Sequence, residues 1–128
     1  MVMMIDDDDD ALEIYQMLIE HTSCADLFVT HNSASVALQS LEEMHQQTCF
    51  PSYILLDLNM PDMGGMEFIK RFEEKFSSVY PQTNVIILTS SVREEDHEKA
   101  LAHPLVTKIM SKPLSKQLLL DIITASET

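Results

Sequence analysis

The sequence predicts an α/β fold, a doubly wound five-stranded parallel sheet with five helices distributed over its two faces. Apolar segments alternate along the chain with segments whose apolar residues recur at helical spacing. Two of the apolar segments, "YILLD" and "NVIILTS", show no polar alternation, as expected of strands buried on both faces of a parallel sheet. Strands that alternate with helices are joined by right-handed crossovers, which place helices on both faces.

In the first half of the chain, the apolar run at residues 2–5 predicts a strand, and helical spacing predicts a helix over about 9–21. "ADLFVTH" (25–31) predicts the second strand, and "NSASVALQSLEEMHQQ" (32–47) opens with capping-type residues and predicts the second helix. The apolar positions of these two helices are Leu12, Tyr15, Leu18, Ile19, Val36, Ala37, Leu38, Leu41 and Met44.

The second half repeats this order. "YILLD" (53–57) predicts the third strand, and "LNMPDMGG" predicts a loop because Pro61 lacks a backbone donor and glycine is conformationally permissive. A helix "MEFIKRFEEKF", a strand "NVIILTS", a helix "REEDHEKALAH" and a strand "VTKIM" follow. The last helix is "SKQLLLDIITA", with apolar residues on one side at Leu118, Leu119, Ile122 and Ile123.

Length and composition favour one ordinary domain, because 128 residues with 45% hydrophobic content can close a single core. The net charge of −13 disfavours nonspecific binding to nucleic acid or an anionic membrane. Cys24 and Cys49 lack metal-ligand spacing, and no signal peptide precedes the acidic run, so we expect reduced thiols and a cytoplasmic location. The five histidines are scattered, and we interpret them as ordinary surface or helix-end residues.

Acidic, hydroxyl and amine side chains stand at the ends of four predicted strands. The carboxyl ends of parallel strands meet at one edge of the sheet, where open α/β folds keep their ligand sites. Oxygen ligands can hold Mg²⁺, an amine can neutralise a transferring group, and a carboxylate can form an aspartyl phosphate. The residues concerned are Asp6, Asp7, Asp57, Thr89, Ser90 and Lys112.

Four motifs carry a resemblance to a known family: "MIDD" (4–7), "ILLDLNMPDMGG" (54–65), "VIILTSS" (85–91) and "MSKPLS" (110–115). In this order and spacing, the sequence resembles the receiver domain of two-component response regulators, of the single-domain chemotaxis type. The resemblance covers essentially the whole chain, which we predict to be one receiver domain at 1–128. It implies a flavodoxin-like sheet with strand order 2-1-3-4-5.

The resemblance also implies a metal site. Asp57 would be the phosphoacceptor and a ligand of Mg²⁺ or Mn²⁺. Asp7 would bind the metal directly, Asp6 mainly through water, and Asn59 through its backbone carbonyl. Asp8 to Asp10, the remainder of the acidic run, are expected in the cap and first turn of the first helix, where the helix dipole favours carboxylates.

On the opposite side of the acceptor, the resemblance makes Thr89 the hydroxyl that moves toward the phosphoryl group and Lys112 the amine that contacts it. Ser90 and Ser91 remain alternatives for the hydroxyl, because only strand register favours Thr89. Pro113 matches the family's Lys-Pro bond, which is commonly cis.

Three departures from the family pattern stand out. Ile109 occupies the position of the usual aromatic switch, so we expect phosphorylation to act mainly on the segment Ser91 to Asp96. Gly64 replaces an acid or asparagine and weakens the expected cap of the third helix. His103-Pro104 replaces a small Gly-Ala turn, so the fourth helix is expected to end differently.

The resemblance implies a sensor histidine kinase or a histidine phosphotransfer protein as phosphodonor, and an unidentified downstream protein target. It implies no enzymatic activity beyond the domain's own phosphorylation and dephosphorylation, no direct binding to nucleic acid or membrane, and a monomer or weak dimer. If the chain is complete, output is expected through protein contacts, because only "SET" follows the last helix.

Three alternatives compete with this interpretation. An EF-hand loop begun at Asp6 fails, because Ala11 and Met17 stand where glycine and glutamate are required. A haloacid dehalogenase-type hydrolase needs a second aspartate where this chain has Asn59. A degenerate receiver acting as a constitutive interaction module is disfavoured, because the acceptor-site residues are all present.

Overall fold

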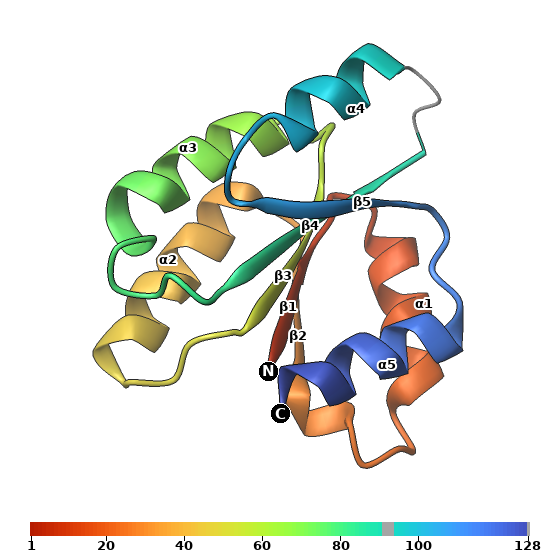
Figure 1. Cartoon of the computed structure of the whole chain (residues 1–128). Helices are drawn as coiled ribbons and strands as arrows, with labels where there is room; N and C mark the ends of the chain where they lie inside the picture. The colour runs from red at the N-terminus through yellow and green to blue at the C-terminus, as the bar shows by residue number, and fades with distance from the viewer. Residues whose placement is uncertain (91–93, 128) are drawn as a thin grey trace.

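A computed structural model of the chain describes residues 1–90 and 94–127. In these residues five parallel strands form one sheet in the order β2-β1-β3-β4-β5 (Figure 1), which confirms the predicted fold class and strand order. The strands are β1 (Val2–Ile5), β2 (Phe28–His31), β3 (Tyr53–Asp57), β4 (Asn84–Thr89) and β5 (Val106–Ser111).

The helices alternate with these strands as predicted, but the second strand begins later than predicted. They are α1 (Asp9–Ile19), α2 (Ala34–Gln46), α3 (Gly65–Phe76), α4 (Glu94–Leu101) and α5 (Lys116–Ser126), with a short 3₁₀ helix η1 (Ala25–Leu27). The prediction of strand from residue 25 was wrong, because a turn in which Leu27 N–H donates to Cys24 O delays β2 until Phe28. The expected phosphorylation response at Ser91 to Asp96 falls partly on residues 91–93, outside the described residues.

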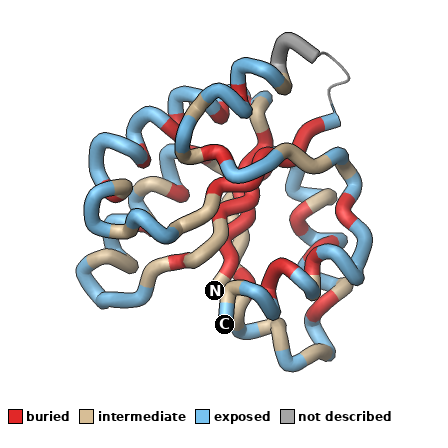
Figure 2. The backbone as a smooth tube through the Cα atoms, viewed as in Figure 1, coloured by how far each residue is buried: buried red, intermediate tan, exposed pale blue. Residues whose placement is uncertain are grey.

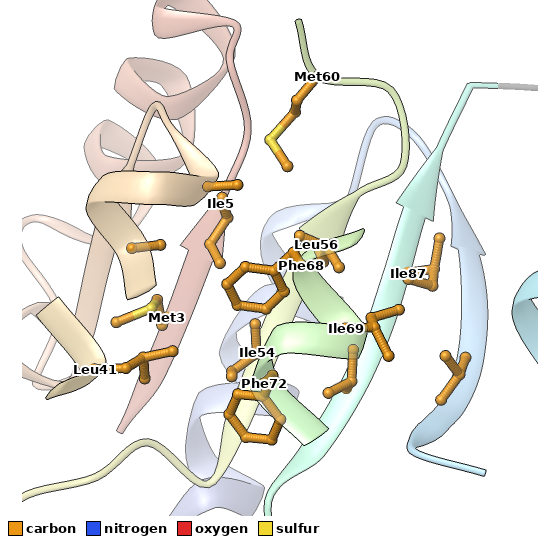
Figure 3. Close-up of a cluster of buried hydrophobic side chains, with 14 of the residues drawn as sticks. Met3, Ile5, Leu41, Ile54, Leu56, Met60, Phe68, Ile69, Phe72 and Ile87 are labelled. Atoms are coloured by element: carbon orange, nitrogen blue, oxygen red, sulfur yellow. The ribbon is translucent and has the colours of Figure 1, made fainter. Parts of the chain in front are cut away.

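Two hydrophobic layers sandwich the sheet. Helices α2, α3 and α4 cover one face and α1 and α5 the other, and buried backbone concentrates along the central strands (Figures 1 and 2). Strand residues alternate between the layers: Ile54 and Leu56 pack toward α3, and Leu55 packs toward α1 and α5. Figure 3 shows the layer beneath α2, α3 and α4, where the rings of Phe68 and Phe72 lie against β3. This double burial explains the uninterrupted apolar runs of the strands.

Helix faces are predicted less well than helix positions. Leu12, Tyr15 and Ile19 are buried as expected, but Val36 is 47% exposed and Leu118 is 44% exposed. Neither residue belongs to the buried set of its helix, which is Ala34, Ala37 and Leu41 in α2 and Leu119, Ile122 and Ile123 in α5. No side chain caps α3 at Gly64, in agreement with the expected loss of a cap.

Four further features bear on the sequence predictions. His31 ends β2 and is partly exposed, and burial lowers its pKa. After α4 ends, the Nδ1 atom of His103 accepts a hydrogen bond from Leu105 N–H at 3.2 Å. Cys24 and Cys49 are free thiols. Within the described part of the chain, no helix is long and apolar enough to cross a membrane.

Candidate functional site

Strand register brings the predicted site residues to one edge of the sheet. Ile5 pairs with Leu56, so Asp6 lies level with Asp57 at the ends of neighbouring strands. Asp57 pairs in turn with Leu88, which places Thr89 one residue further along the same edge. The convergence predicted from the parallel topology is therefore present.

Three carboxylates gather at this edge. Asp6, Asp7 and Asp57 can each offer one oxygen such that all three oxygens lie within 4.8 Å of one another. Asp6 is 1% and Asp57 8% exposed, whereas Asp7 faces solvent. Backbone amides fix the two buried carboxylates: Asp8 N–H donates to Asp6 Oδ1 at 3.0 Å and Asn59 N–H to Asp57 Oδ1 at 3.3 Å. Such a donor set suits a hard divalent cation.

Lys112 supplies the positive charge of the site. Its Nζ lies 2.6 Å from Asp6 Oδ2 and 3.4 Å from Asp57 Oδ2. Its backbone N–H donates to the carbonyl of Thr89 at 3.0 Å, which ties the end of β5 to the end of β4. The Lys112-Pro113 peptide bond is cis, as the resemblance implied. The ammonium of Lys112 therefore lies within ion-pair distance of two buried carboxylates.

The electrostatics of the pair follow from partial burial. Burial raises the pKa of Asp57 above its ordinary value of 3.8, and the positive charge of Lys112 and the Asn59 N–H offset only part of this rise. Burial opposes the charge of Lys112 as well, but contacts with Asp6 and Asp57 outweigh it, and its pKa is raised. The three carboxylates thus carry more negative charge than Lys112 neutralises, and a bound divalent cation would offset this excess.

The structure also separates the neighbouring candidates. Thr89 is buried at the end of β4, whereas Ser90 is exposed, and Ser91 lies outside the described residues. Asp8 caps α1 by accepting from Asp10 N–H and Ala11 N–H, while Asp9 and Asp10 form its first turn, which confirms the expectation for the rest of the acidic run. The acidic run therefore divides into a site pair and a helix start.

The loop after Asp57 packs closely against the site. Met60 is buried in the hydrophobic layer that Figure 3 shows. A Cβ atom on Gly65 would lie 2.9 Å from both the carbonyl oxygen of Asp57 and the Cα of Leu58, so only glycine fits there without a backbone shift. Glycine at this position lets α3 begin directly beside the strand end.

Sequence reasoning missed two residues that contact this region. The carboxylate of Asp62 accepts hydrogen bonds from the hydroxyls of Ser33 and Ser35, each at 2.7 Å. The Tyr15 hydroxyl accepts a hydrogen bond from the backbone N–H of Leu114, two residues after Lys112. Helical spacing marked Tyr15 only as a core residue, and no local pattern signals a contact across 99 residues.

Comparison with known proteins identifies the family. The model of the response regulator receiver domain matches residues 2–124. The chain belongs to this family. Its receiver fold is shared by a two-component response regulator from Cytophaga hutchinsonii, with 30% identity, a TM-score of 0.83, and 98% of this chain and 95% of that chain covered. A receiver protein from Dyadobacter fermentans DSM 18053 is 27% identical with a TM-score of 0.78, covering 98% and 96% of the two chains.

Curated relatives are longer than the region they share with this receiver domain. The Bacillus subtilis (strain 168) transcriptional regulatory protein YdfI is 33% identical over 96 residues, which are 75% of this chain and 39% of that protein. The uncharacterized transcriptional regulatory protein YhcZ of the same organism is 36% identical over 62 residues, 48% of this chain and 26% of that protein. The chain therefore spans less than half the length of these relatives.

Proposed function

We propose that this receiver domain accepts a phosphoryl group on the carboxylate of Asp57. The observation that carries the proposal is the position of Asp57: it ends a buried strand, has Asp6 and Asp7 within reach of a shared cation, and lies 3.4 Å from Lys112 Nζ. Among the described residues, no other carboxylate combines these features.

The reaction is a nucleophilic displacement at phosphorus. An oxygen of Asp57 forms a bond to the phosphorus atom while the bond from phosphorus to a histidine nitrogen of the donor breaks, and that nitrogen keeps the electron pair. The ammonium of Lys112 neutralises charge on the transferring group, and the Thr89 hydroxyl donates a hydrogen bond to one of its oxygens. The product is an acyl phosphate, which water hydrolyses to restore the carboxylate.

The proposed cofactor is Mg²⁺ or Mn²⁺, and the three clustered carboxylates fit it. Asp7 and Asp57 would bind the cation directly, Asp6 mainly through water, and Asn59 through its backbone carbonyl. When bound, the cation supplies further positive charge against the transferring phosphoryl group. The ammonium of Lys112, which also contacts Asp6, orients the acceptor carboxylate of Asp57.

The proposed donor is a sensor histidine kinase or a histidine phosphotransfer protein, and the proposed output is an altered contact with a downstream protein. We also propose a cytoplasmic location, a monomer or weak dimer, and no direct contact with nucleic acid or membrane. The charge of −13 supports the last point, because it repels polyanions.

Incubation with acetyl phosphate and Mg²⁺, followed by intact mass measurement, tests the proposal. We expect one added phosphoryl group in the wild-type chain, none in Asp57→Asn, and one in the control Asp10→Asn, which alters an exposed carboxylate of the first turn of α1. An equal gain in Asp57→Asn would refute the assignment. No gain in any variant would favour a constitutive interaction module, and sustained phosphate release from a phosphate monoester would favour a hydrolase.

A further inference from the structure

The hydroxyl of Tyr15 makes a buried contact that its place in a hydrophobic helix face does not require. Tyr15 lies on α1 and is 4% exposed, and its Oη atom accepts a hydrogen bond from Leu114 N–H at 3.1 Å. Leu114 is also 4% exposed and belongs to the same hydrophobic layer. A phenylalanine could fill the same space, so the hydroxyl serves the amide rather than the packing.

The amide that donates to Tyr15 belongs to the connection between β5 and α5. Pro113 has no N–H, so Leu114 carries the first amide after that of Lys112. The Lys112 amide donates to Thr89 on β4, and the Leu114 amide donates to Tyr15 on α1. The connection is therefore anchored on both sides of Pro113, to two different elements. A buried amide without an acceptor is unfavourable, so loss of the hydroxyl favours movement of this connection.

The partner of Lys112 lies just before the same helix. Asp6 lies three residues before the first residue of α1, and its Oδ1 accepts from Asp8 N–H at the helix cap. The side chain of Lys112 reaches across to Asp6 Oδ2 at 2.6 Å. Helix α1 is thus connected to Asp6 through the chain and to the β5–α5 connection through Tyr15. Helix α5 packs beside α1 (Figure 1).

We infer that Tyr15 is a positioning residue for Lys112. By accepting the Leu114 amide, it holds the β5–α5 connection where the ammonium faces Asp6 and Asp57. Tyr15 touches neither the acceptor carboxylate nor the transferring group, and it acts only through the backbone on which Lys112 stands. Its effect on phosphorylation rests on the proposed function of Asp57.

Tyr15→Phe removes only the hydroxyl and tests the inference. We expect phosphorylation of Asp57 by acetyl phosphate to slow about tenfold, because small misplacements of a catalytic group cost one to two orders of magnitude. The Kd of Mg²⁺ should not rise, because its proposed ligands lie at the ends of β1 and β3 and a displaced Lys112 ammonium competes less for Asp6 and Asp57. A general disturbance of α1 would weaken Mg²⁺ binding as well, and that result would contradict a role through Lys112.

Two controls sharpen the result. Tyr80→Phe removes another hydroxyl, one that pairs with His45 Nδ1 at 2.8 Å, and should leave the phosphorylation rate unchanged. In a Lys112→Ala background, which itself slows phosphorylation, adding Tyr15→Phe should have no further effect. Independent, multiplicative effects of the two substitutions would overturn the inference.

Two measurements need no phosphorylation and separate this inference from the proposed function. Lys112 should react several-fold faster with an amine-acylating reagent in Tyr15→Phe than in wild type or Tyr80→Phe, as read by peptide mass. The Leu114 amide should exchange slowly in the wild-type chain. Unchanged labelling of Lys112, or rapid exchange at Leu114, would refute the positioning role. A wild-type chain that accepts no phosphoryl group would refute only the proposed function.

Discussion

At the scale of single residues, the site is a balance between burial and charge. Asp6 and Asp57 are nearly inaccessible to solvent, and the ammonium of Lys112 lies within ion-pair distance of both. The raised pKa of Lys112 means that its ion pairs stabilise the fold fully below the ordinary pKa of 10.5. This contribution is lost as pH rises through the folded-state pKa. The pKa of Asp57 is also raised, so stability again falls with rising pH, but here because the charged form is the unfavourable one.

Asp57→Asn should stabilise the fold in metal-free buffer. Burial raises the pKa of Asp57, so the unfolded chain releases this proton at lower pH than the folded chain does. The carboxylate therefore costs stability as pH rises from about 3.8 through the folded-state pKa, and the cost persists above it. We expect a gain of about 1 kcal/mol at pH 7, the lower end of the cost of burying a polar group.

Urea denaturation in a chelator, between pH 3 and pH 7, measures this effect. The advantage of Asp57→Asn should grow with rising pH across the window and then level off. Asp10→Asn, which changes an exposed carboxylate, provides the comparison. An advantage that is largest at low pH, or absent at pH 7, would contradict this account of the buried carboxylate.

At the scale of elements, helix starts define the site from two sides. α1 begins three residues after Asp6, and α3 begins at Gly65, whose N–H donates to Leu58 O at 2.9 Å. This backbone hydrogen bond joins the two ends of the loop between Asp57 and α3. This closure brings the start of α3 into contact with the end of β3.

Gly65→Ala should displace the end of β3. The new Cβ would lie 2.9 Å from backbone atoms of Asp57 and Leu58, which cannot rotate away as a side chain would. We expect a loss of about 1–3 kcal/mol, typical of overpacking, together with slower phosphorylation of Asp57. Gly64→Ala is the matched control, because its Cβ would lie 4.0 Å from its nearest neighbour, Leu58 O, and the substitution should cost less than about 1 kcal/mol. Equal losses in denaturation experiments would show that close approach at Gly65 is unimportant.

A second contact between elements links the site loop to α2. The carboxylate of Asp62 accepts from Ser33, the N-cap of α2, and from Ser35, and these hydrogen bonds lower the pKa of Asp62 to about 2. The depressed pKa gives stability that is present above the ordinary value of 3.8 and is lost as pH falls toward 2. Because Asp62 is exposed, we expect Asp62→Asn to cost less than about 1 kcal/mol at pH 7.

Acid denaturation followed by circular dichroism measures the contribution of Asp62. The difference between wild type and Asp62→Asn should shrink as pH falls from 4 to 2, while Glu42→Gln on α2 should match wild type throughout. A difference that is constant with pH would mean that the carboxylate charge contributes nothing to this contact.

At the scale of the whole molecule, the sequence predicted what topology enforces. Parallel strands must end at one edge, so Asp6, Asp57 and Lys112 could be brought together from their places in the chain alone. The exposure of Val36 and Leu118 was not predictable, because helical spacing defines a stripe but not its margins. The Tyr15 contact with Leu114 joins residues 99 apart and depends on how α1 and the β5–α5 connection pack, which no local pattern records.

The charge of the whole chain provides a final test of the metal site. At a net charge of −13, self-repulsion destabilises the fold, and any salt should relieve part of it by screening. A specific site adds a second effect: at free Mg²⁺ about ten times its Kd, binding to the folded state contributes about 1.4 kcal/mol beyond screening. We therefore expect MgCl₂ to stabilise the chain more than NaCl at matched ionic strength. Asp7→Ala should lose this excess yet keep the response to NaCl, whereas Asp9→Ala should keep both. Equal loss of the excess in the two variants would reveal a diffuse acidic surface in place of a site.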